Sequence, residues 1–378
     1  MKYRKFGKLD WQVSALGFGA MRLPVVEGDN TKIDEAEAIK MIRYAIDHGV
    51  NYVDTAYPYH GGNGEIVVGK ALKDGYRERI KLATKMPTWM VNSHADMDNY
   101  LGEQLSKLQT DHVDFYLLHS LEKKRWAKMQ ELNVFEWAEK TIADGRIRYL
   151  GFSFHDDYSV FKDIVDSYKN WTLCQIQYNY ENEDNQAGTK GLKYAAGKGL
   201  AVVIMEPLLG GTLTHPPDAV KRVWENARKD PVNMALQWLW NKPEVSVVLS
   251  GMSAMEQVRQ NVSNASRSGV GTLIKEELDL VAQVHSKYKE MTPIPCTKCG
   301  YCMPCPNGVD IPRNFDLYNQ AIAYNNLNQS REIYSSKFFP EEQRASACKD
   351  CNTCEEKCPQ HIMISEWMPK VHEELSRT

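Results

Sequence analysis

Short apolar runs alternate with amphipathic helical patterns along most of this chain, and that alternation limits its fold more than any other feature. Each apolar run has the length of a strand, and a segment of helical periodicity follows it. The strands are expected at residues 15–19, 52–54, 80–84, 113–118, 147–152, 173–178, 200–205 and 245–249. The helices are expected at residues 34–48, 64–72, 95–108, 130–143, 157–168, 188–198, within 218–240, and at 254–265. Eight such units predict a (β/α)₈ TIM barrel. An open doubly wound sheet is the alternative, but no G-x-G-x-x-G follows the first strand.

Three successive apolar runs lead to polar residues that suit acid–base chemistry. Residues 52–54 end at Asp54, with Tyr59 in the loop that follows, and the next two runs lead to Lys85 and His119. In a closed parallel barrel the carboxyl ends of the strands share the face where active sites form. Each residue alone is better explained as a cap, a satisfied buried group or a surface lysine. The four together, at matched strand ends, favour a catalytic site.

The same residues resemble the tetrad motifs of the aldo-keto reductases. The match comprises Asp54-Thr55-Ala56 with Tyr59 five residues after the aspartate, then Thr84-Lys85, then Leu117-Leu118-His119. Further motifs follow in the family's order: Gly151-Phe152-Ser153, Gln175-Ile176-Gln177-Tyr178, Pro207-Leu208 with Gly210-Gly211, and Ser250-Gly251 through Gln257 and Asn261. The resemblance spans roughly residues 3–265.

This resemblance implies an oxidoreductase that interconverts a carbonyl and an alcohol with NAD(P)H. Carbonyl reduction needs a proton at oxygen, and a phenol with a pKa near 10 is a poor acid at neutral pH. A neighbouring ammonium lowers that pKa, and a carboxylate holds the ammonium in place. The roles implied are Tyr59 as proton donor, Lys85 as its electrostatic partner, Asp54 as the orienter of Lys85, and His119 as the residue that positions the carbonyl. Tyr57 is the competing phenol, but the spacing favours Tyr59.

The resemblance also implies NADPH lying across the barrel mouth. Ser153 and Gln175 would hold the nicotinamide carboxamide, and the Gly210-Gly211 loop would approach the pyrophosphate. The complete set expected to contact the cofactor is Gly19, Met21, Ser153, Gln175, Met205, Pro207, Leu208, Gly210, Gly211, Gly251, Gln257 and Asn261.

Three departures from the family pattern bear on the choice of cofactor. Phe154 stands where an asparagine is usual, and Met205 replaces the aromatic that commonly stacks on the nicotinamide. Gly251 and Gln257 stand where many members place basic residues against the 2′-phosphate. Because a phosphate is normally met by Arg or Lys, their absence weakens the case for NADP over NAD. A flavin mononucleotide (FMN) in the same groove is a further candidate.

Charge and hydropathy narrow the class of partner. The net charge of -3 argues against a general nucleic-acid footprint, and the basic run Lys123-Lys124-Arg125 is expected to be a solvated loop. No apolar run approaches the roughly 20 residues of a membrane span, and no apolar core follows the basic start as in a signal peptide. A cytoplasmic location is therefore expected, with a small-molecule partner and neither nucleic acid nor membrane.

Eight of the nine cysteines lie after residue 295, whereas Cys174 stands alone and is expected to be a core thiol. The crowded cysteines form two runs, Cys296, Cys299, Cys302 and Cys305, then Cys348, Cys351, Cys354 and Cys358. In a cytoplasmic chain such crowding indicates metal ligation rather than disulfides. We expect domain limits of 1–290 for the barrel and 291–378 for this module, near the prolines at 293 and 295.

The second run has the bacterial ferredoxin spacing, and the first is one residue shorter before its last cysteine. Two [4Fe-4S] clusters are favoured over zinc, which usually takes separated C-x₂-C pairs. Because the fourth ligand of each cluster in two-cluster ferredoxins comes from the other run, the expected sets are Cys296, Cys299, Cys302 with Cys358, and Cys348, Cys351, Cys354 with Cys305. The residues between the runs are expected to be helical, with Phe315, Tyr318 and Ile322 on one face.

The whole chain resembles the iron–sulfur-containing aldo-keto reductases of anaerobic bacteria and archaea. Three hypotheses follow. The barrel reduces carbonyls while the clusters are structural or sense redox state; or the clusters relay electrons between a ferredoxin-like carrier and a flavin or substrate in the barrel; or the barrel only binds, and the cysteine module does the work. The complete tetrad argues against the third.

Overall fold

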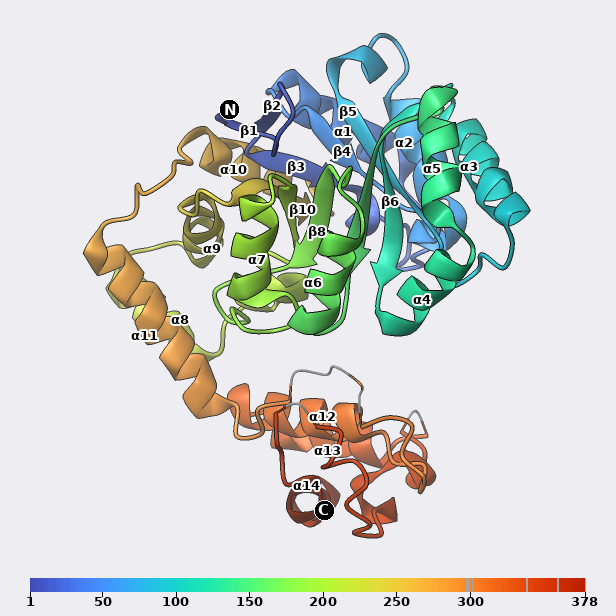
Figure 1. Ribbon diagram of the computed structural model, residues 1–378. Helices are drawn as coiled ribbons and strands as arrows, with labels where there is room; N and C mark the ends of the chain where they lie inside the picture. The colour runs from blue at the N-terminus through green and yellow to red at the C-terminus, as the bar shows by residue number, and fades with distance from the viewer. Residues whose placement is uncertain (297–299, 301, 338, 359, 378) are drawn as a thin grey trace. The chain divides into compact units, whose positions relative to one another are not determined.

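The computed structural model describes residues 1–296, 300, 302–337, 339–358 and 360–377 (Figure 1). Its internal contacts divide the chain into two units. The barrel unit comprises Met1–Thr214 and Asp230–Lys275, and the cysteine unit comprises His215–Lys229 and Glu276–Thr378. The limits 1–290 and 291–378 stay predictions. Within the described ranges, no helix is both long and apolar enough to cross a membrane.

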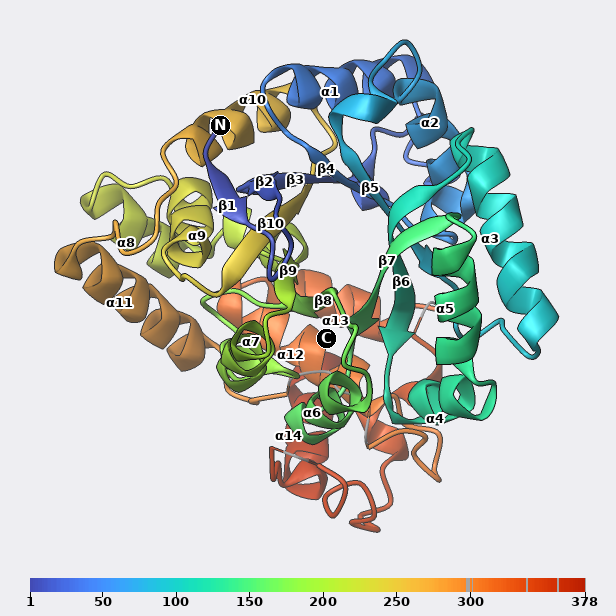
Figure 2. The same ribbon diagram turned by 45° about the horizontal axis from the view of Figure 1, so that its top comes forward.

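Eight parallel strands close into a barrel in the order β10-β3-β4-β5-β6-β7-β8-β9, as the sequence predicts (Figure 2). Neighbours along the chain are neighbours in the sheet, so the barrel closes where β10 pairs with β3. The barrel strands are β3 (Leu16–Gly19), β4 (Tyr52–Asp54), β5 (Lys81–Met86), β6 (Val113–Leu121), β7 (Ile147–Phe154), β8 (Leu173–Gln177), β9 (Ala201–Met205) and β10 (Val245–Gly251).

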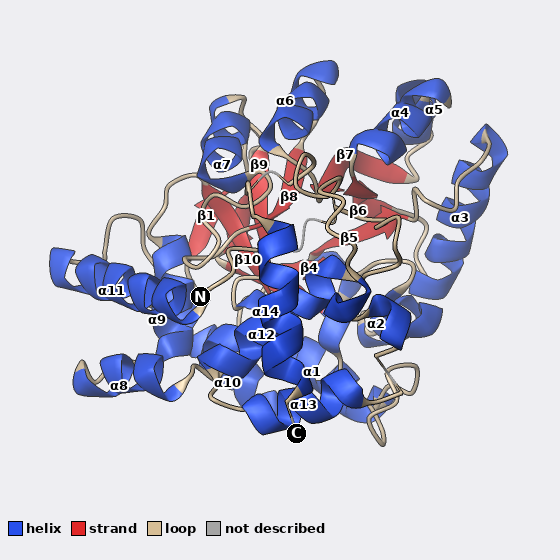
Figure 3. Cartoon of the chain, turned by 90° about the horizontal axis from the view of Figure 1, so that it is seen from below, coloured by secondary structure: helices blue, strands red, loops and turns tan. Residues whose placement is uncertain are grey.

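Helices surround the strands of the barrel unit (Figure 3). They are α1 (Glu35–Asp47), α2 (Gly64–Ala71), α3 (His94–Leu108), α4 (Lys123–Glu131), α5 (Val134–Ala143), α6 (Tyr158–Ser167), α7 (Gly188–Gly197), α9 (Pro231–Trp240) and α10 (Met255–Ser266). Two predictions are wrong here. The helix expected at 130–143 is two helices, because Asn133 adopts a left-handed backbone between them. The basic run expected to be a loop is the first turn of α4, because Glu122 caps that helix through the backbone N–H groups of Lys124 and Arg125.

A hairpin of β1 (Tyr3–Lys5) and β2 (Gln12–Ser14) precedes the barrel. Its Phe6 and Val13 belong to the same buried cluster as the side chains that fill the barrel interior. Those interior residues are Tyr52, Ala83, Phe115, Leu117, Leu173, Ala201, Val203, Val247 and Leu249. The barrel is therefore a packed core rather than a pore, and its chemistry must lie at a strand end.

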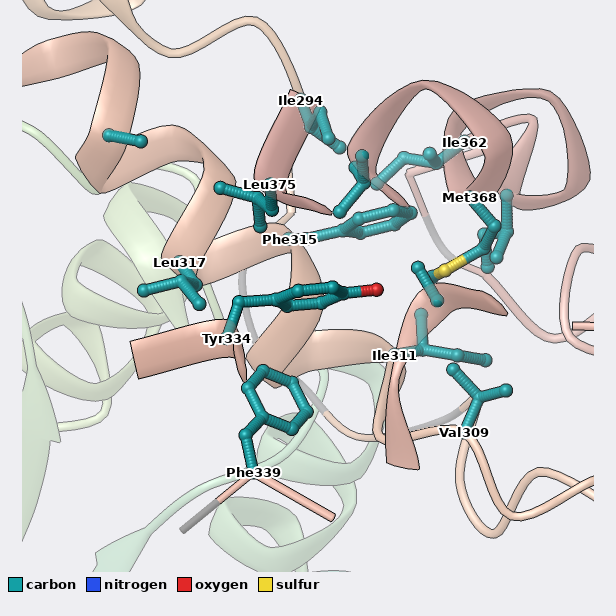
Figure 4. Close-up of a cluster of buried hydrophobic side chains, with 14 of the residues drawn as sticks. Ile294, Val309, Ile311, Phe315, Leu317, Tyr334, Phe339, Ile362, Met368 and Leu375 are labelled. Carbon is teal, nitrogen blue, oxygen red and sulfur yellow. The ribbon is translucent and has the colours of Figure 1, made fainter. Parts of the chain in front are cut away.

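The cysteine unit is helical, with its own apolar core. Its helices are α8 (Asp218–Asn226), α11 (Lys275–Met291), α12 (Ile311–Ala323), α13 (Leu327–Ser335) and α14 (Ile364–Ser376). Phe315, Tyr334 and Met368 lie fully or almost fully buried in that core (Figure 4). Phe315, Tyr318 and Ile322 all lie in α12 at the spacing of one helical face, as the sequence predicts. Phe315 is buried and Tyr318 packs against the core, whereas Ile322 is 37% exposed.

Candidate active site

The expected site residues follow from the two-residue period of the barrel strands. Side chains alternate between the two faces of a strand, so the residue two positions beyond an interior residue also faces inward. Tyr52, Ala83 and Leu117 fill the interior, and two residues further along their strands stand Asp54, Lys85 and His119. The same step from Leu173, Val203 and Leu249 reaches Gln175, Met205 and Gly251. The carboxyl ends of the strands thus collect the expected residues on one face.

Lys85 lies at the centre of the arrangement. Its Nζ is 2.6 Å from Asp54 Oδ1, 2.8 Å from the carbonyl oxygen of Thr55 and 3.4 Å from the hydroxyl of Tyr59. The Lys85 side chain is completely buried and Asp54 almost completely so. A buried ammonium must be paired, and these three oxygens pair it. The carbonyl of Thr55 carries no signature in the sequence, and sequence reasoning missed it.

The electrostatics of this group depend on burial as much as on charge. Burial alone would lower the pKa of Lys85, but Asp54 and Tyr59 outweigh it and raise the pKa above the ordinary value. Burial raises the pKa of Tyr59, although Lys85 acts to lower it. The expected effect of Lys85 on the phenol is present, but it is smaller than the effect of burial. Tyr59 is therefore a neutral phenol beside a cation at neutral pH.

The loop after β4 sets which tyrosine meets Lys85. His60 has a left-handed backbone and is buried; its ring nitrogens contact the backbone N–H of Leu23 at 3.2 Å and the carbonyl of Asn30 at 2.8 Å. Gly64 lets α2 start close to Tyr59, because a Cβ there would lie 3.1 Å from the Tyr59 carbonyl oxygen. Tyr57 instead donates its hydroxyl to Glu103 on α3. Tyr59, and not Tyr57, is the phenol next to Lys85.

A buried polar network lies behind Lys85. Gln104 on α3 donates to the carbonyl of Lys85 at 3.1 Å and to Glu65 on α2 at 2.6 Å. The hydroxyls of Thr84 and Tyr116 join the same network, through Glu65 and Gln104 respectively. Because these groups come from α2, α3, β5 and β6, the network ties the strand that carries Lys85 to its neighbours.

His119 lies where β6 bulges. The register of β6 against β7 shifts between Leu118 and Leu121, and Ser120 has a left-handed backbone. The His119 ring lies 6.0 Å from the Tyr59 ring, centroid to centroid. Burial, followed by Lys85, His155 and Arg125, lowers the pKa of His119 well below its usual value. His119 is therefore a neutral imidazole.

We expect this neutral histidine to make stability depend on pH. Its pKa is lowered in the folded chain, so its contribution to the free energy of unfolding is complete above about pH 6.5. That contribution is lost as the pH falls, because the unfolded chain then binds a proton that the folded chain does not bind. Wild type should therefore lose unfolding free energy faster than His119→Gln below about pH 6.5, by up to ~1.4 kcal/mol per pH unit. Urea titrations at several pH values would measure the difference, and parallel curves for the two proteins would contradict it.

The positions expected to hold a nicotinamide carboxamide offer complementary groups. Among the described residues, Gln175 Oε1 is buried without a hydrogen-bond partner. The Ser153 oxygen accepts the backbone N–H of Ser120 at 2.7 Å, which leaves its own hydroxyl proton to donate. One acceptor and one donor are what a carboxamide requires. The residues present therefore fit the group.

The loop after β9 suits a phosphate. Gly210 and Gly211 both have positive φ, and a Cβ on Gly211 would meet no atom within 4 Å. The Arg22 stem runs along Gly251, and its Nη2 would lie 3.5 Å from a Cβ on Gly210, as would Oε2 of Glu206. Arg22 is thus a cation beside the expected pyrophosphate loop, and sequence reasoning missed it although it directly follows Met21.

Other residues that are expected to contact the cofactor make contacts within the protein. Gln257 accepts the backbone N–H of Ser253 at 2.8 Å, and Asn261 donates to the Ser250 hydroxyl at 3.1 Å. Met205 receives a long contact of 3.7 Å from the Gln175 amide. Pro207 is buried, Leu208 is half-buried, and Met21 is 51% exposed. Gly19 faces the backbone of Ser250, where a Cβ would lie 3.2 Å from the carbonyl oxygen.

The cysteines of the second unit surround two hollows, although no three His, Cys, Asp or Glu side chains of the described part of the chain converge on a single ion. One hollow is lined by Cys305 together with Cys348, Cys351 and Cys354. The other is lined by Cys296, Cys302 and Cys358. Cys299, expected in the second set, lies outside the described residues. Cysteine sulfurs are the ligands that iron–sulfur clusters take, so the residues that line both hollows fit such clusters.

The last cysteine of each run therefore lines the hollow of the other run. Ile311 and Ile364 line both hollows and form an apolar wall between them. Outside this unit, Cys174 is completely buried in β8, and burial raises its pKa. Cys174 is therefore a core thiol, as predicted.

Comparison with known families agrees with this geometry. The model of the Aldo/keto reductase family matches residues 15–270, which is more than half of the chain. The chain belongs to the aldo/keto reductase family. A second model, the 4Fe-4S dicluster domain, matches residues 295–363. This aldo/keto reductase is thus an NAD(P)-dependent oxidoreductase with a ferredoxin-type module.

Three proteins similar to this aldo/keto reductase each match most of its length but not all of it. L-galactose dehydrogenase of Arabidopsis thaliana is 27% identical over 77% of this chain and 97% of its own. NADH-specific methylglyoxal reductase of Escherichia coli is 27% identical over 70% of this chain and 93% of its own. A crystal structure of an aldo-keto reductase from Klebsiella pneumoniae in complex with NADPH is 26% identical, with a TM-score of 0.62 over 75% of this chain and 95% of its own.

Proposed function

We propose that the barrel unit interconverts a carbonyl and an alcohol with a nicotinamide cofactor. The observation that carries this proposal is the position of Lys85 Nζ, in contact with both Asp54 and the hydroxyl of Tyr59. A cation held by one carboxylate and directed at a neutral phenol is the arrangement that proton donation to a carbonyl oxygen needs. Around it lie a neutral histidine and a carboxamide-binding pair.

A bound NAD(P)H supplies the hydride that the substrate carbon accepts. Tyr59 donates its phenolic proton to the substrate oxygen as negative charge develops there. Lys85 stabilises the phenolate that remains, and Asp54 keeps the Lys85 ammonium in place. His119, being neutral, donates a ring N–H to the carbonyl oxygen and orients the substrate. In the reverse direction the Tyr59 phenolate takes the proton of the alcohol.

Either nicotinamide cofactor is compatible with this proposal. The K. pneumoniae structure supports NADP, whereas the E. coli relative is NADH-specific. Arg22 beside the Gly210-Gly211 loop can meet the pyrophosphate, which both cofactors share. FMN stays a prediction that these comparisons do not support.

The test is turnover by the anaerobically purified protein with a panel of aldehydes and ketones, monitored as loss of NADPH or NADH absorbance. We expect oxidation of one cofactor in proportion to alcohol formed, with deuterium passing from 4-deuterated cofactor to the substrate carbon. Cofactor oxidation without alcohol would contradict hydride transfer to a carbonyl.

We further propose that the two clusters transfer electrons to or from a ferredoxin-like carrier. Cys351 supports this, because it is exposed while it lines the same hollow as Cys305, Cys348 and Cys354. An exposed ligand shortens the path to a docked carrier. The alternative is that the clusters are structural or sense redox state. Electron paramagnetic resonance would show whether a reduced ferredoxin reduces the clusters, as electron transfer requires, or leaves them oxidised, which would contradict it.

Asn307 is expected to tune the cluster at Cys351. Its side-chain nitrogen donates to Cys351 Sγ at 3.6 Å, and hydrogen bonds to cluster sulfurs raise the reduction potential. A contribution of ~0.5–1.5 kcal/mol corresponds to roughly 20–60 mV for one electron, so Asn307→Ala should lower one of two potentials by that amount. Potentiometric titration would measure it, with Asn352→Ala as a control in the same hollow. Unchanged potentials would refute this role.

A further inference from the structure

A cation lies at the substrate end of the site, beyond the tetrad. Arg125, in the first turn of α4, holds its Cζ 5.4 Å from the centroid of the Trp89 ring. The Trp89 ring lies 5.2 Å from that of His119, which in turn lies 6.0 Å from that of Tyr59. A continuous series of contacts therefore leads from the proton donor to a guanidinium. Trp89 is 39% exposed and the Arg125 side chain 34%, so both are open to an incoming molecule.

The charge of Arg125 is only weakly compensated. Among the described residues Arg125 forms an ion pair within 4 Å only with Glu122, where Nε and Oε1 are 3.8 Å apart. The two Glu122 oxygens already accept the backbone N–H groups of Lys124 at 2.7 Å and Arg125 at 2.9 Å, which caps α4. Within the described ranges, Arg125 Nη1 donates one short bond, to the carbonyl of Ser120 at 2.8 Å. A guanidinium has five N–H donors in a planar fork, so most remain available.

We propose that the substrate carries an anionic group, a carboxylate or a phosphate, that Arg125 binds while the carbonyl lies at Tyr59 and His119. This inference rests on the proposed carbonyl–alcohol chemistry and names the substrate class of the same site. The guanidinium matches the geometry of a carboxylate or phosphate and can bind either in a bidentate manner. The Trp89 ring beneath it restricts the side chain and keeps water from one face.

A purely structural role for Arg125 makes a different prediction. In that role, its bond to the Ser120 carbonyl would brace the bulge that places His119, where Ser120 has a left-handed backbone and its N–H donates to Ser153. Loss of that brace would impair every substrate equally. Anion binding affects charged substrates alone. The comparison of charged and uncharged substrates therefore separates the two roles.

The experiment measures kcat/KM for matched substrate pairs with wild type and Arg125→Met. One pair is 4-formylbenzoate and its methyl ester; the other is glyceraldehyde 3-phosphate and glyceraldehyde. We expect Arg125→Met to lower kcat/KM about 10- to 100-fold for the charged member that the site accepts, as loss of a charged hydrogen-bond pair does. The uncharged member should change less than about threefold. The pair that responds identifies carboxylate or phosphate as the source.

Two further measurements test whether the loss of kcat/KM arises only from the removal of a positive charge or from impaired folding. Lys128→Met removes an equal charge from the same helix, and the Lys128 ammonium bonds Asn92 at 2.9 Å; it should leave the charged-to-uncharged ratio unchanged. In wild type, salt should reduce the preference for the charged member, because ions screen the partly exposed Arg125. This arm needs no variant to fold.

Equal losses for charged and uncharged members in Arg125→Met, or no preference for either anion in wild type, would overturn the anion assignment and leave the carbonyl chemistry intact. No NAD(P)H oxidation by wild type with any of the four compounds, nor with the wider carbonyl panel, would overturn the proposed function and this inference with it.

Discussion

Replacement of Tyr59 by phenylalanine is expected to lower kcat for carbonyl reduction by roughly 10²- to 10⁴-fold, the usual contribution of a positioned general acid. Only one oxygen is removed, and it is the oxygen that lies 3.4 Å from the Lys85 ammonium. The aromatic ring and its packing are retained, so cofactor affinity should stay within about threefold. Steady-state turnover and cofactor fluorescence titration would measure the two quantities separately.

The matched control is Tyr57→Phe, two residues earlier in the same loop. Its hydroxyl bonds Glu103, and its pKa is raised to about 12 by burial and by that carboxylate. Because this phenol does not contact Lys85, we expect turnover within about threefold of wild type. Full activity in Tyr59→Phe would remove Tyr59 from the mechanism. Loss of activity in Tyr57→Phe instead would identify the other phenol as the donor.

Cys305→Ala is expected to remove one whole cluster, so that iron content falls from about eight to about four atoms per chain. The cluster lost should be that of Cys348, Cys351 and Cys354, because Cys305 lines their hollow. Iron and sulfide analysis and electron paramagnetic resonance would count the cluster that remains. Cys174→Ala, which alters only the core thiol of the barrel, should leave both clusters in place.

Double variants decide which cysteines share a cluster. If Cys305 and Cys348 hold the same cluster, the double variant Cys305→Ala with Cys348→Ala should retain one cluster. The double variant Cys305→Ala with Cys296→Ala should then retain none. If each run instead holds its own cluster, the two results would be exchanged, and the shared-ligand arrangement would be refuted.

The sequence alone predicted the barrel and the placement of its site. Each strand is a short apolar run, and the step of two residues from Tyr52 to Asp54 or from Ala83 to Lys85 keeps a side chain on the inner face. The spacing within each strand is sufficient to place these residues in the site, because the carboxyl ends of the strands together form the rim of the barrel. The cysteine spacing likewise predicted a dicluster module, and the family model confirms it.

Local sequence patterns did not predict every element and contact of the structure. The basic run at residues 123–125 has the composition of a loop, yet Glu122 caps it as the start of α4. That turn brings Arg125 of α4 to Trp89 in the loop after β5, a contact between distant segments that no periodicity encodes. Ile322 lies at the helical spacing that puts it on the face of Phe315, yet it is 37% exposed, because spacing predicts the face of a helix and not how far the core covers it.

The pKa values and contacts of the site residues depend on the tertiary structure. The sequence identified Lys85 as the partner of Tyr59, but not that burial would outweigh Lys85 and raise the pKa of the phenol. The contact of Lys85 with the Thr55 carbonyl and the position of Arg22 beside Gly210 are likewise visible only once the strands are closed. Residue type and spacing determine which groups reach the rim of the barrel. Their protonation and partners depend on desolvation and on contacts between distant segments, which only the folded chain creates.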